Sequence, residues 1–117
     1  MKKLLTLTLA LLLVAVFVHQ AIAATTVTVV ISPDTVVLEE NVSEYVLTAH
    51  VGIAYNSVLP DSVELDGIPA DLVKPDLRDE LVAKFNVPIS KLPPGQVTFT
   101  LSGATENDTF SGSDTIS

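Results

Sequence analysis

The stretch that decides the fold is residues 96–103, Gln-Val-Thr-Phe-Thr-Leu-Ser-Gly, followed after a polar turn by residues 110–116, Phe-Ser-Gly-Ser-Asp-Thr-Ile. In the first segment Val97, Phe99 and Leu101 fall on one side of an extended chain, and hydroxyl residues fall on the other. This period of two is typical of a strand with one buried face. The two segments therefore predict a β-hairpin that forms one arm of a small sandwich.

The chain before this hairpin also divides into short extended segments. Residues 25–31 are rich in β-branched side chains and predict the first strand. Ser32-Pro33-Asp34 interrupts it, and residues 35–38 are expected to continue it as a kinked edge strand. Apolar and polar residues then alternate over 45–53, which predicts a strand with Tyr45 in the core.

Turn residues divide the middle of the chain. Asp66-Gly67 is a dipeptide that a two-residue hairpin turn prefers, so it predicts a strand on each side. Pro69 and Pro75 predict an edge or irregular strand rather than a central one, because proline has no amide hydrogen to donate to a ladder. Residues 81–85 alternate like a strand with one solvated face, and residues 87–92 predict a single helical turn or a tight crossover. The whole pattern predicts an all-β, Ig-like, two-sheet antiparallel sandwich of about seven strands.

The N-terminus has the features of a secretory signal peptide. Lys2 and Lys3 precede an apolar run over residues 4–18, and Ala21-Ile22-Ala23 is the small-x-small site that signal peptidase accepts. Residues 1–23 are therefore interpreted as a cleaved signal and residues 24–117 as one domain. The alternative is an uncleaved anchor, although a membrane-spanning helix needs about 20 apolar residues. We expect a secreted, periplasmic or cell-surface protein that is free of the membrane after cleavage.

The predicted domain is strongly acidic. Its basic residues are Lys74, Arg78, Lys84 and Lys91, and against all 14 acidic residues they leave a net charge of 4 − 14 = −10. This charge argues against nucleic acids and anionic lipid surfaces as partners, because both need a basic footprint. The chain has no cysteine, so no disulfide stabilises the domain.

Four phrases resemble a known module when they are taken together and in order. They are Ile-Ser-Pro-Asp-Thr at 31–35, Ser-Val-Glu-Leu-Asp-Gly-Ile-Pro-Ala at 62–70, Val-Ala-Lys-Phe at 82–85 and Phe-Ser-Gly-Ser-Asp-Thr-Ile at 110–116. They are similar to a small Ig-like β-sandwich module that recurs in secreted and cell-surface proteins of bacteria and archaea. The resemblance spans nearly all of residues 24–117.

The resemblance also implies a loop that looks calcium-binding, placed before the Lys-Phe strand. Here that loop reads Lys-Pro-Asp-Leu-Arg-Asp-Glu at 74–80, with two basic residues and no glycine. Asp76, Asp79 and Glu80 could supply carboxylate oxygens, but calcium needs six to eight oxygens from a loop that wraps around it. We therefore interpret residues 74–80 as a solvated turn and expect no cofactor, with calcium as the alternative.

Candidate binding residues are few. The domain has no tryptophan, and Tyr55 beside Asn56 is the aromatic residue free to form a sugar-binding platform; packing within a turn is its alternative role. Asp114 is an even number of residues from Phe110 and Ile116, so in a regular strand its side chain would lie on the same face as theirs. It is therefore either buried and hydrogen-bonded to backbone or turned outward by a bulge at Gly112. We favour the bulge, and Asp114 joins the candidate binding residues.

Three classes of function stay open. The leading hypothesis is a non-catalytic structural or interaction module for adhesion or surface assembly, because no catalytic set is evident and His50 alternates as a plain strand residue. The second hypothesis is a carbohydrate-binding module centred on Tyr55, and the third is a small secreted hydrolase or inhibitor. The expected partner is a protein or cell-surface component, with self-association through an open sheet edge at the final strand as one form.

Asn41-Val42-Ser43 and Asn107-Asp108-Thr109 are glycosylation acceptors only in a host with that machinery.

Overall fold

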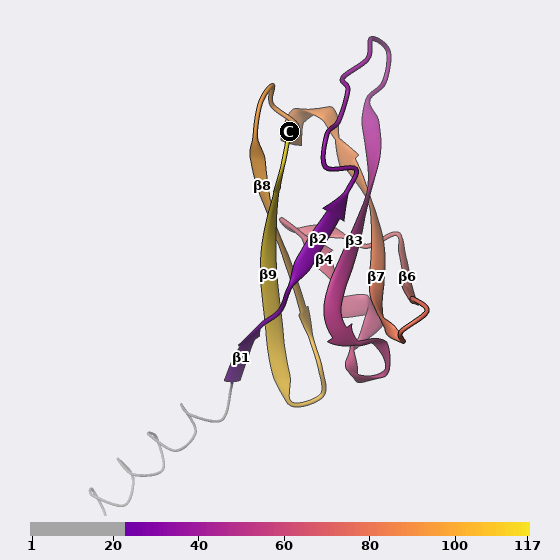
Figure 1. The fold of residues 1–117 in the computed structure, drawn as a ribbon, viewed down its shortest axis with the longest axis vertical. Helices are drawn as coiled ribbons and strands as arrows, with labels where there is room; N and C mark the ends of the chain where they lie inside the picture. Colours follow the sequence, from indigo (N-terminus) through magenta and orange to yellow (C-terminus); the bar gives the residue numbers. More distant parts are fainter. Residues whose placement is uncertain (1–22) are drawn as a thin grey trace, which may run out of the picture.

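The computed structural model describes residues 23–117, which fold into a sandwich of two β-sheets (Figure 1). The predicted signal peptide lies outside the described residues, apart from Ala23. Within residues 23–117, no helix is long and apolar enough to cross a membrane.

The first sheet has five strands in the order β1-β9-β8-β4-β5. Its strands are β1 (Ala23–Thr26), β9 (Asp108–Ile116), β8 (Val97–Ala104), β4 (Glu64–Leu65) and β5 (Ile68–Pro69). β8 and β9 form the predicted hairpin and pair from Val97 opposite Ile116 to Ala104 opposite Thr109. β1 pairs with β9 in parallel, so this sheet is mixed.

The second sheet has four strands in the order β2-β3-β7-β6, all antiparallel. Its strands are β2 (Val29–Ser32), β3 (Glu44–Ala54), β7 (Glu80–Pro88) and β6 (Leu72–Pro75). Short 3₁₀ turns lie in the connections, at Tyr55–Ser57 (η1), Pro60–Ser62 (η2) and Ile89–Lys91 (η3). The turn η3 confirms the helical turn predicted within 87–92.

The core lies between the two sheets and is formed by the alternating side chains. Phe99 and Leu101 of β8 face inward as predicted, while Thr98 and Thr100 are exposed. Phe85, Phe99 and Phe110 are the largest fully buried side chains. The other fully buried large side chains are aliphatic: Ile31, Leu47, Leu65, Leu81, Leu101, Ile116, Val63 and Val87. Burial of alternate residues from both sheets is therefore the main stabilising interaction.

The predicted turn chemistry is confirmed in the middle of the chain. Asp66 and Gly67 both have positive φ angles, 47° and 83°, and join β4 to β5 as a two-residue hairpin turn. Pro69 and Pro75 lie in β5 and β6, the edge strands of their sheets. Proline is tolerated there because one side of an edge strand needs no ladder hydrogen bond.

Three predictions about the strands are wrong. The expected seven antiparallel strands are nine, in one mixed and one antiparallel sheet. The predicted strand over 25–31 is divided, because the chain leaves the first sheet after β1 and enters the second at β2. Val27 and Thr28, which connect the two strands, continue the alternation of apolar and polar residues. The sequence pattern therefore does not show where the chain crosses from one sheet to the other. Residues 35–38 form no strand and belong to the β2–β3 loop.

The bulge expected at Gly112 is also absent from the β8–β9 pairing, which runs without a shift in register. Asp114 therefore points inward with Phe110 and Ile116, and it is half-buried. Its Oδ2 accepts a hydrogen bond of 2.8 Å from the Ile31 amide, and its Oδ1 accepts one of 2.9 Å from the Thr115 amide. Asp114 thus provides a hydrogen-bond acceptor for an amide of edge strand β2, and this hydrogen bond joins the two sheets.

The final strand does not leave the open edge that the sequence suggests. β1 pairs with residues 108–111 of β9, and the Val27 amide continues this contact by donating to the Ser111 carbonyl at 2.9 Å. At the other end, Ser117 exchanges two 2.8 Å hydrogen bonds with the backbone of Asp34 and Val36. The N-terminal part of the domain therefore covers the edge at which we expected a partner strand.

Candidate functional site

The outer face of the four-stranded sheet carries the most distinctive surface of the domain. Its side chains come from alternate positions of β3, β7 and β6: His50 lies opposite Val82, and Val82 lies opposite Lys74. One step along the ladder, Thr48 lies opposite Lys84, and Lys84 lies opposite Leu72. Because side chains opposite one another share a face, antiparallel register brings these residues together from distant parts of the chain.

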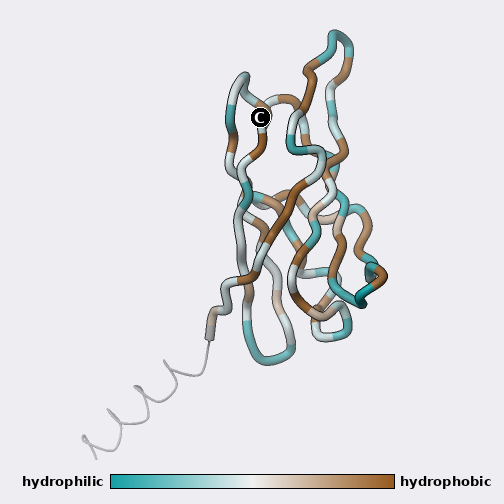
Figure 2. Tube along the Cα trace, in the orientation of Figure 1, coloured by the Kyte–Doolittle hydropathy of each residue, from teal (hydrophilic) through white to brown (hydrophobic). Residues whose placement is uncertain are grey.

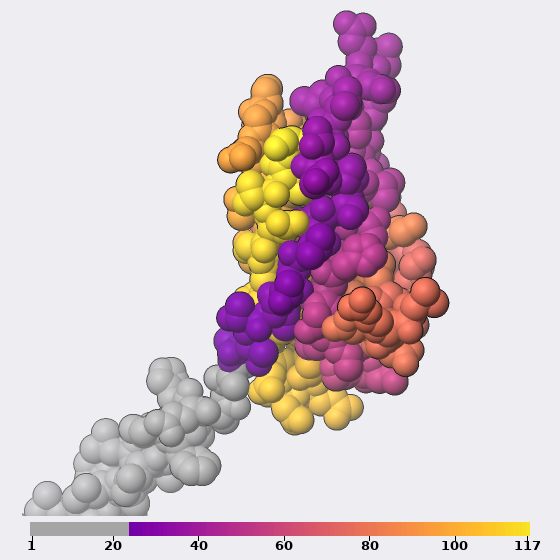
Figure 3. Space-filling model, in the orientation of Figure 1, coloured from indigo at the N-terminus to yellow at the C-terminus, as the bar shows by residue number. Residues whose placement is uncertain are grey.

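Two adjoining hollows lie on this face, with volumes of about 610 and 530 Å³. His50, Asp76 and Leu77 line both hollows, so the β6–β7 turn forms the boundary between them. In the space-filling view this turn, in coral, stands over the surface of β3 (Figure 3). We call the two hollows together the cationic groove.

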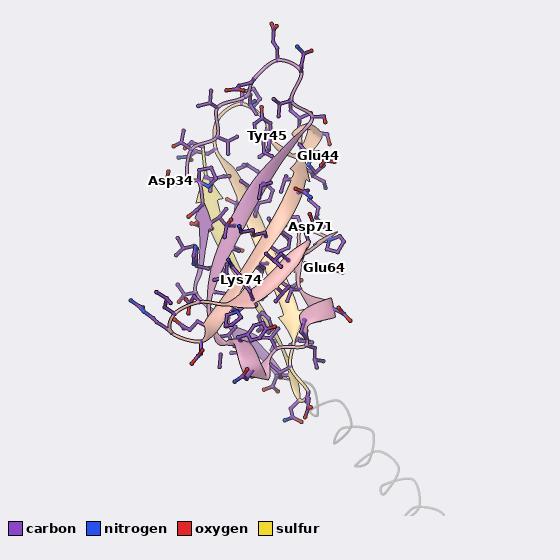
Figure 4. All side chains as sticks on the ribbon, turned by 90° about the vertical axis from the view of Figure 1, so that its right-hand side faces the viewer. Asp34, Glu44, Tyr45, Glu64, Asp71 and Lys74 are labelled. Carbon is purple, nitrogen blue, oxygen red and sulfur yellow. The ribbon has the colours of Figure 1, made fainter. Side chains whose placement is uncertain are left out.

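Three of the four lysines and arginines of residues 23–117 line the cationic groove. Lys74 and Lys84 line the smaller hollow together with His50, and Arg78 lines the larger one. Figure 4 shows Lys74 on the sheet face toward the viewer, with Glu64 to its right and Asp71 above. The lining carries these three basic side chains against two acidic ones, Asp76 and Glu80, in a domain whose net charge is −10, from 4 basic and 14 acidic residues.

Apolar surface accompanies these charges. Val82 forms part of the smaller hollow and keeps only 4 % of its surface exposed, although it points away from the core. His50 and Lys74 lie opposite it on the two neighbouring strands, and a lysine stem there can cover apolar neighbours. Val30 and Leu72 remain about half exposed nearby, and Leu77 is fully exposed. The face thus combines positive charge with apolar contact area.

Asp76 organises the turn beside the groove. Its Oδ1 accepts hydrogen bonds from the amides of Arg78 at 2.7 Å and Glu80 at 2.9 Å. The Glu80 amide is the main reason that the pKa of Asp76 is lower than its ordinary value of 3.8, and desolvation acts in the opposite direction. The Arg78 amide and the charges of Arg78 and His50 lower this pKa further.

Asp76→Asn should lower the melting temperature at neutral pH, because the amide accepts these two hydrogen bonds less strongly than a carboxylate. A lowered folded-state pKa contributes stability above the unfolded value, near 3.8, and loses it as the pH falls through the folded value. The difference in melting temperature between wild type and variant should therefore disappear in acid. Thermal melts at several pH values measure it, with Asp61→Asn as the exposed control. A difference that stays constant down to low pH would contradict this role.

The structure does not gather the candidate calcium residues into a cation site. Asp76 uses its Oδ1 for backbone amides, and Asp79 is an exposed turn residue with a φ of 61°. Across the described part of the chain, no three His, Cys, Asp or Glu side chains form a group that could hold a metal ion. Asp76 and Asp79 instead lie in the turn between β6 and β7, and Glu80 begins β7; Asp76 and Glu80 also line the larger hollow.

The candidate binding residues lie apart from the groove lining. Tyr55 begins η1, is half-buried and packs against the core, while Asn56 next to it is exposed. The Tyr55 amide also donates to the Asp79 carbonyl at 2.9 Å, which connects η1 to the β6–β7 turn. Asp114 has the structural role described above. None of these three residues lines either hollow.

Sequence reasoning missed the cationic groove because its residues are far apart along the chain. His50 occupies the strand position that we predicted, but its location beside Lys74 and Lys84 depends on strand order. One signal was present in the sequence: three of the four basic residues fall within the segment from Lys74 to Lys84.

Comparison with protein-family models, curated proteins and solved structures gives no significant match.

Proposed function

We propose that this chain is a non-catalytic structural and interaction module of the extracellular or periplasmic space, and that the cationic groove is its binding surface. The observation that carries the proposal is the concentration of Lys74, Arg78 and Lys84 on one sheet face of an acidic domain. Such a face attracts an anionic partner over a distance, and the apolar surface beside it supplies contact area. The partner is therefore expected to be acidic and partly apolar.

The strand order supports an Ig-like arrangement as part of this proposal. In Ig-like sandwiches one sheet holds strands A, B, E and D, and the other holds G, F and C with additions. Lettering β2 to β9 in chain order as A, B, C, C′, D, E, F and G gives A-B-E-D and G-F-C-C′ for the two sheets. β1 then adds to the free side of G. Sandwiches with this order present sheet faces to partners while the core remains closed.

Titration of ¹⁵N-labelled protein with a hexaglutamate peptide tests the binding surface. We expect amide shifts at His50, Lys74 and Lys84 that diminish with added salt, since exposed charges are screened. Lys74→Gln/Lys84→Gln should weaken binding about tenfold, the effect of losing two charge contacts. Lys91→Gln is the matched control, because Lys91 is exposed in η3 and does not line the groove.

Hexalysine serves as the second control, and it should leave the amides of Lys74 and Lys84 unchanged. The proposal is wrong if hexaglutamate leaves the groove amides unchanged. It is also wrong if Lys91→Gln weakens binding as much as the double variant does.

A further inference from the structure

We propose that the cationic groove binds the β2–β3 loop of a second copy of this chain, so that copies associate head to tail. This inference rests on the proposed function, because it names the partner of that groove. It follows from the composition of the loop, from its position in the fold and from its complementarity to the groove.

The β2–β3 loop, residues 33–43, presents apolar and acidic side chains together. Val37 is 71 % exposed and Leu38 is 40 % exposed, and the exposed Glu39 and Glu40 follow them directly. Figure 2 shows apolar segments next to a hydrophilic tip in this loop. Two adjacent apolar side chains in solvent beside two carboxylates have the composition expected of the groove's partner.

Hydrogen bonds hold the loop in its extended position. The Glu39 amide donates to the Tyr45 hydroxyl at 2.7 Å, and the Val36 amide donates to the Ser117 carbonyl at 2.8 Å. These contacts fix the base of the loop against β3 and the end of β9. In Figure 1 the loop extends beyond the body of the sandwich.

The loop begins at Pro33, next to Ser32 of the smaller hollow, but its tip at Glu39 and Glu40 lies toward the opposite end of the sheet from the rest of the groove. The loop enters β3 at Glu44, whereas His50 of the groove is six residues further along that strand, a distance of about 20 Å. In Figure 4 Glu44 and Tyr45 lie at one end of the sheet and Lys74 lies toward the other. A loop held away from its own groove can reach the groove of another copy. Such a contact joins two different surfaces and propagates as an open chain unless a ring closes.

The two surfaces are complementary in charge and in apolar character. Glu39 and Glu40 supply negative charges for Lys74 and Lys84. Val37 and Leu38 supply apolar area for the surface around Val82, where the smaller hollow has a volume of about 530 Å³. A hollow of this size accepts a few side chains of a loop. The net negative charge of the domain opposes association, so the contact should be reversible and dependent on concentration.

Two double variants separate the two surfaces. Glu39→Gln/Glu40→Gln removes the loop charges and keeps the groove, while Lys74→Gln/Lys84→Gln removes the groove charges and keeps the loop. Sedimentation velocity of the purified wild type should show an average mass that rises with concentration. Each double variant alone should raise the apparent dissociation constant about tenfold. Lys91→Gln and Glu106→Gln, both exposed and outside these surfaces, should behave as wild type.

Mixing the two double variants gives the sharpest result. The intact groove of one and the intact loop of the other form a single wild-type contact. At concentrations where neither double variant associates alone, an equimolar mixture should therefore give 1:1 dimers and no larger species. Thermal melts of each variant establish that the fold is unchanged. A mixture that stays monomeric at concentrations where the wild type associates would overturn the inference. Association as strong as that of the wild type in both double variants would also overturn it, because it would place the interface elsewhere.

Failure of this inference and failure of the proposed function are distinguishable. Wild type that remains monomeric at high concentration, but whose groove binds hexaglutamate, would reject the second copy as partner and keep the groove as a binding surface. A groove that binds neither hexaglutamate nor a second copy would reject both.

Discussion

Phe99→Ala should lower the free energy of unfolding by about 3 to 5 kcal/mol, as expected for removal of a buried aromatic ring. Phe99 lies in β8 with 1 % of its surface exposed and belongs to the single cluster of buried residues from both sheets. A domain of this size has a total stability of about 5 to 14 kcal/mol. The substitution should therefore remove a large fraction of it.

Urea unfolding followed by circular dichroism measures this effect. Thr98→Ala is the matched control, because Thr98 is the neighbouring residue on the exposed face of the same strand. Thr98 Oγ1 lies 2.7 Å from Thr115 Oγ1, and loss of this exposed hydrogen bond should cost about 1 kcal/mol or less. Equal destabilisation by the two variants would show that the core face is assigned wrongly.

Gly112→Ala should destabilise the domain by about 3 kcal/mol, at the upper end of the range for overpacking. A methyl group at Gly112 would lie 2.6 Å from Val29 Cγ2 and closer still to the Val27 carbonyl oxygen. The obstacle is backbone, where the chain crosses from β1 to β2, so rotation of a side chain cannot relieve it. We expect the N-terminal segment to be displaced from β9.

Thermal melting and amide hydrogen exchange test this prediction together. The Val27 amide donates to Ser111 in the wild type, and in the variant it should lose protection. Gly52→Ala is the control, because a methyl group there meets nothing nearer than 3.5 Å, at Thr28 Cβ. An unchanged melting temperature for Gly112→Ala would mean that the crossing segment moves aside without cost.

The error at Asp114 has a definite physical origin. Its position in the alternating pattern correctly placed it on the same face of the strand as Phe110 and Ile116. We expected a bulge because burying a carboxylate without a partner costs free energy. The compensating partner, the amide of Ile31, comes from 83 residues away in the sequence and from the other sheet. A local pattern contains no information about a donor at that distance.

The cationic groove illustrates the same limit for the candidate site. The alternation of residues 45–53 and 81–85 correctly assigned His50 and Lys84 to solvated strand positions. Alternation does not say which strands are neighbours, and β6 reaches the groove as an edge strand beside β7. Lys74 and His50 share one surface because β7 lies between their strands and Val82 of β7 is opposite both of them.

Four features could be predicted from the sequence: the all-β class, the inward faces of β3, β7 and β8, the Asp66-Gly67 turn and the proline-containing edge strands. These features depend on interactions between near neighbours in the chain, which leave a period of two or a turn dipeptide in the sequence. The tertiary structure alone decided the crossing between β1 and β2, the inward orientation of Asp114 and the assembly of the cationic groove. These features depend on strand order and register, which arise when both sheets bury their apolar faces against each other.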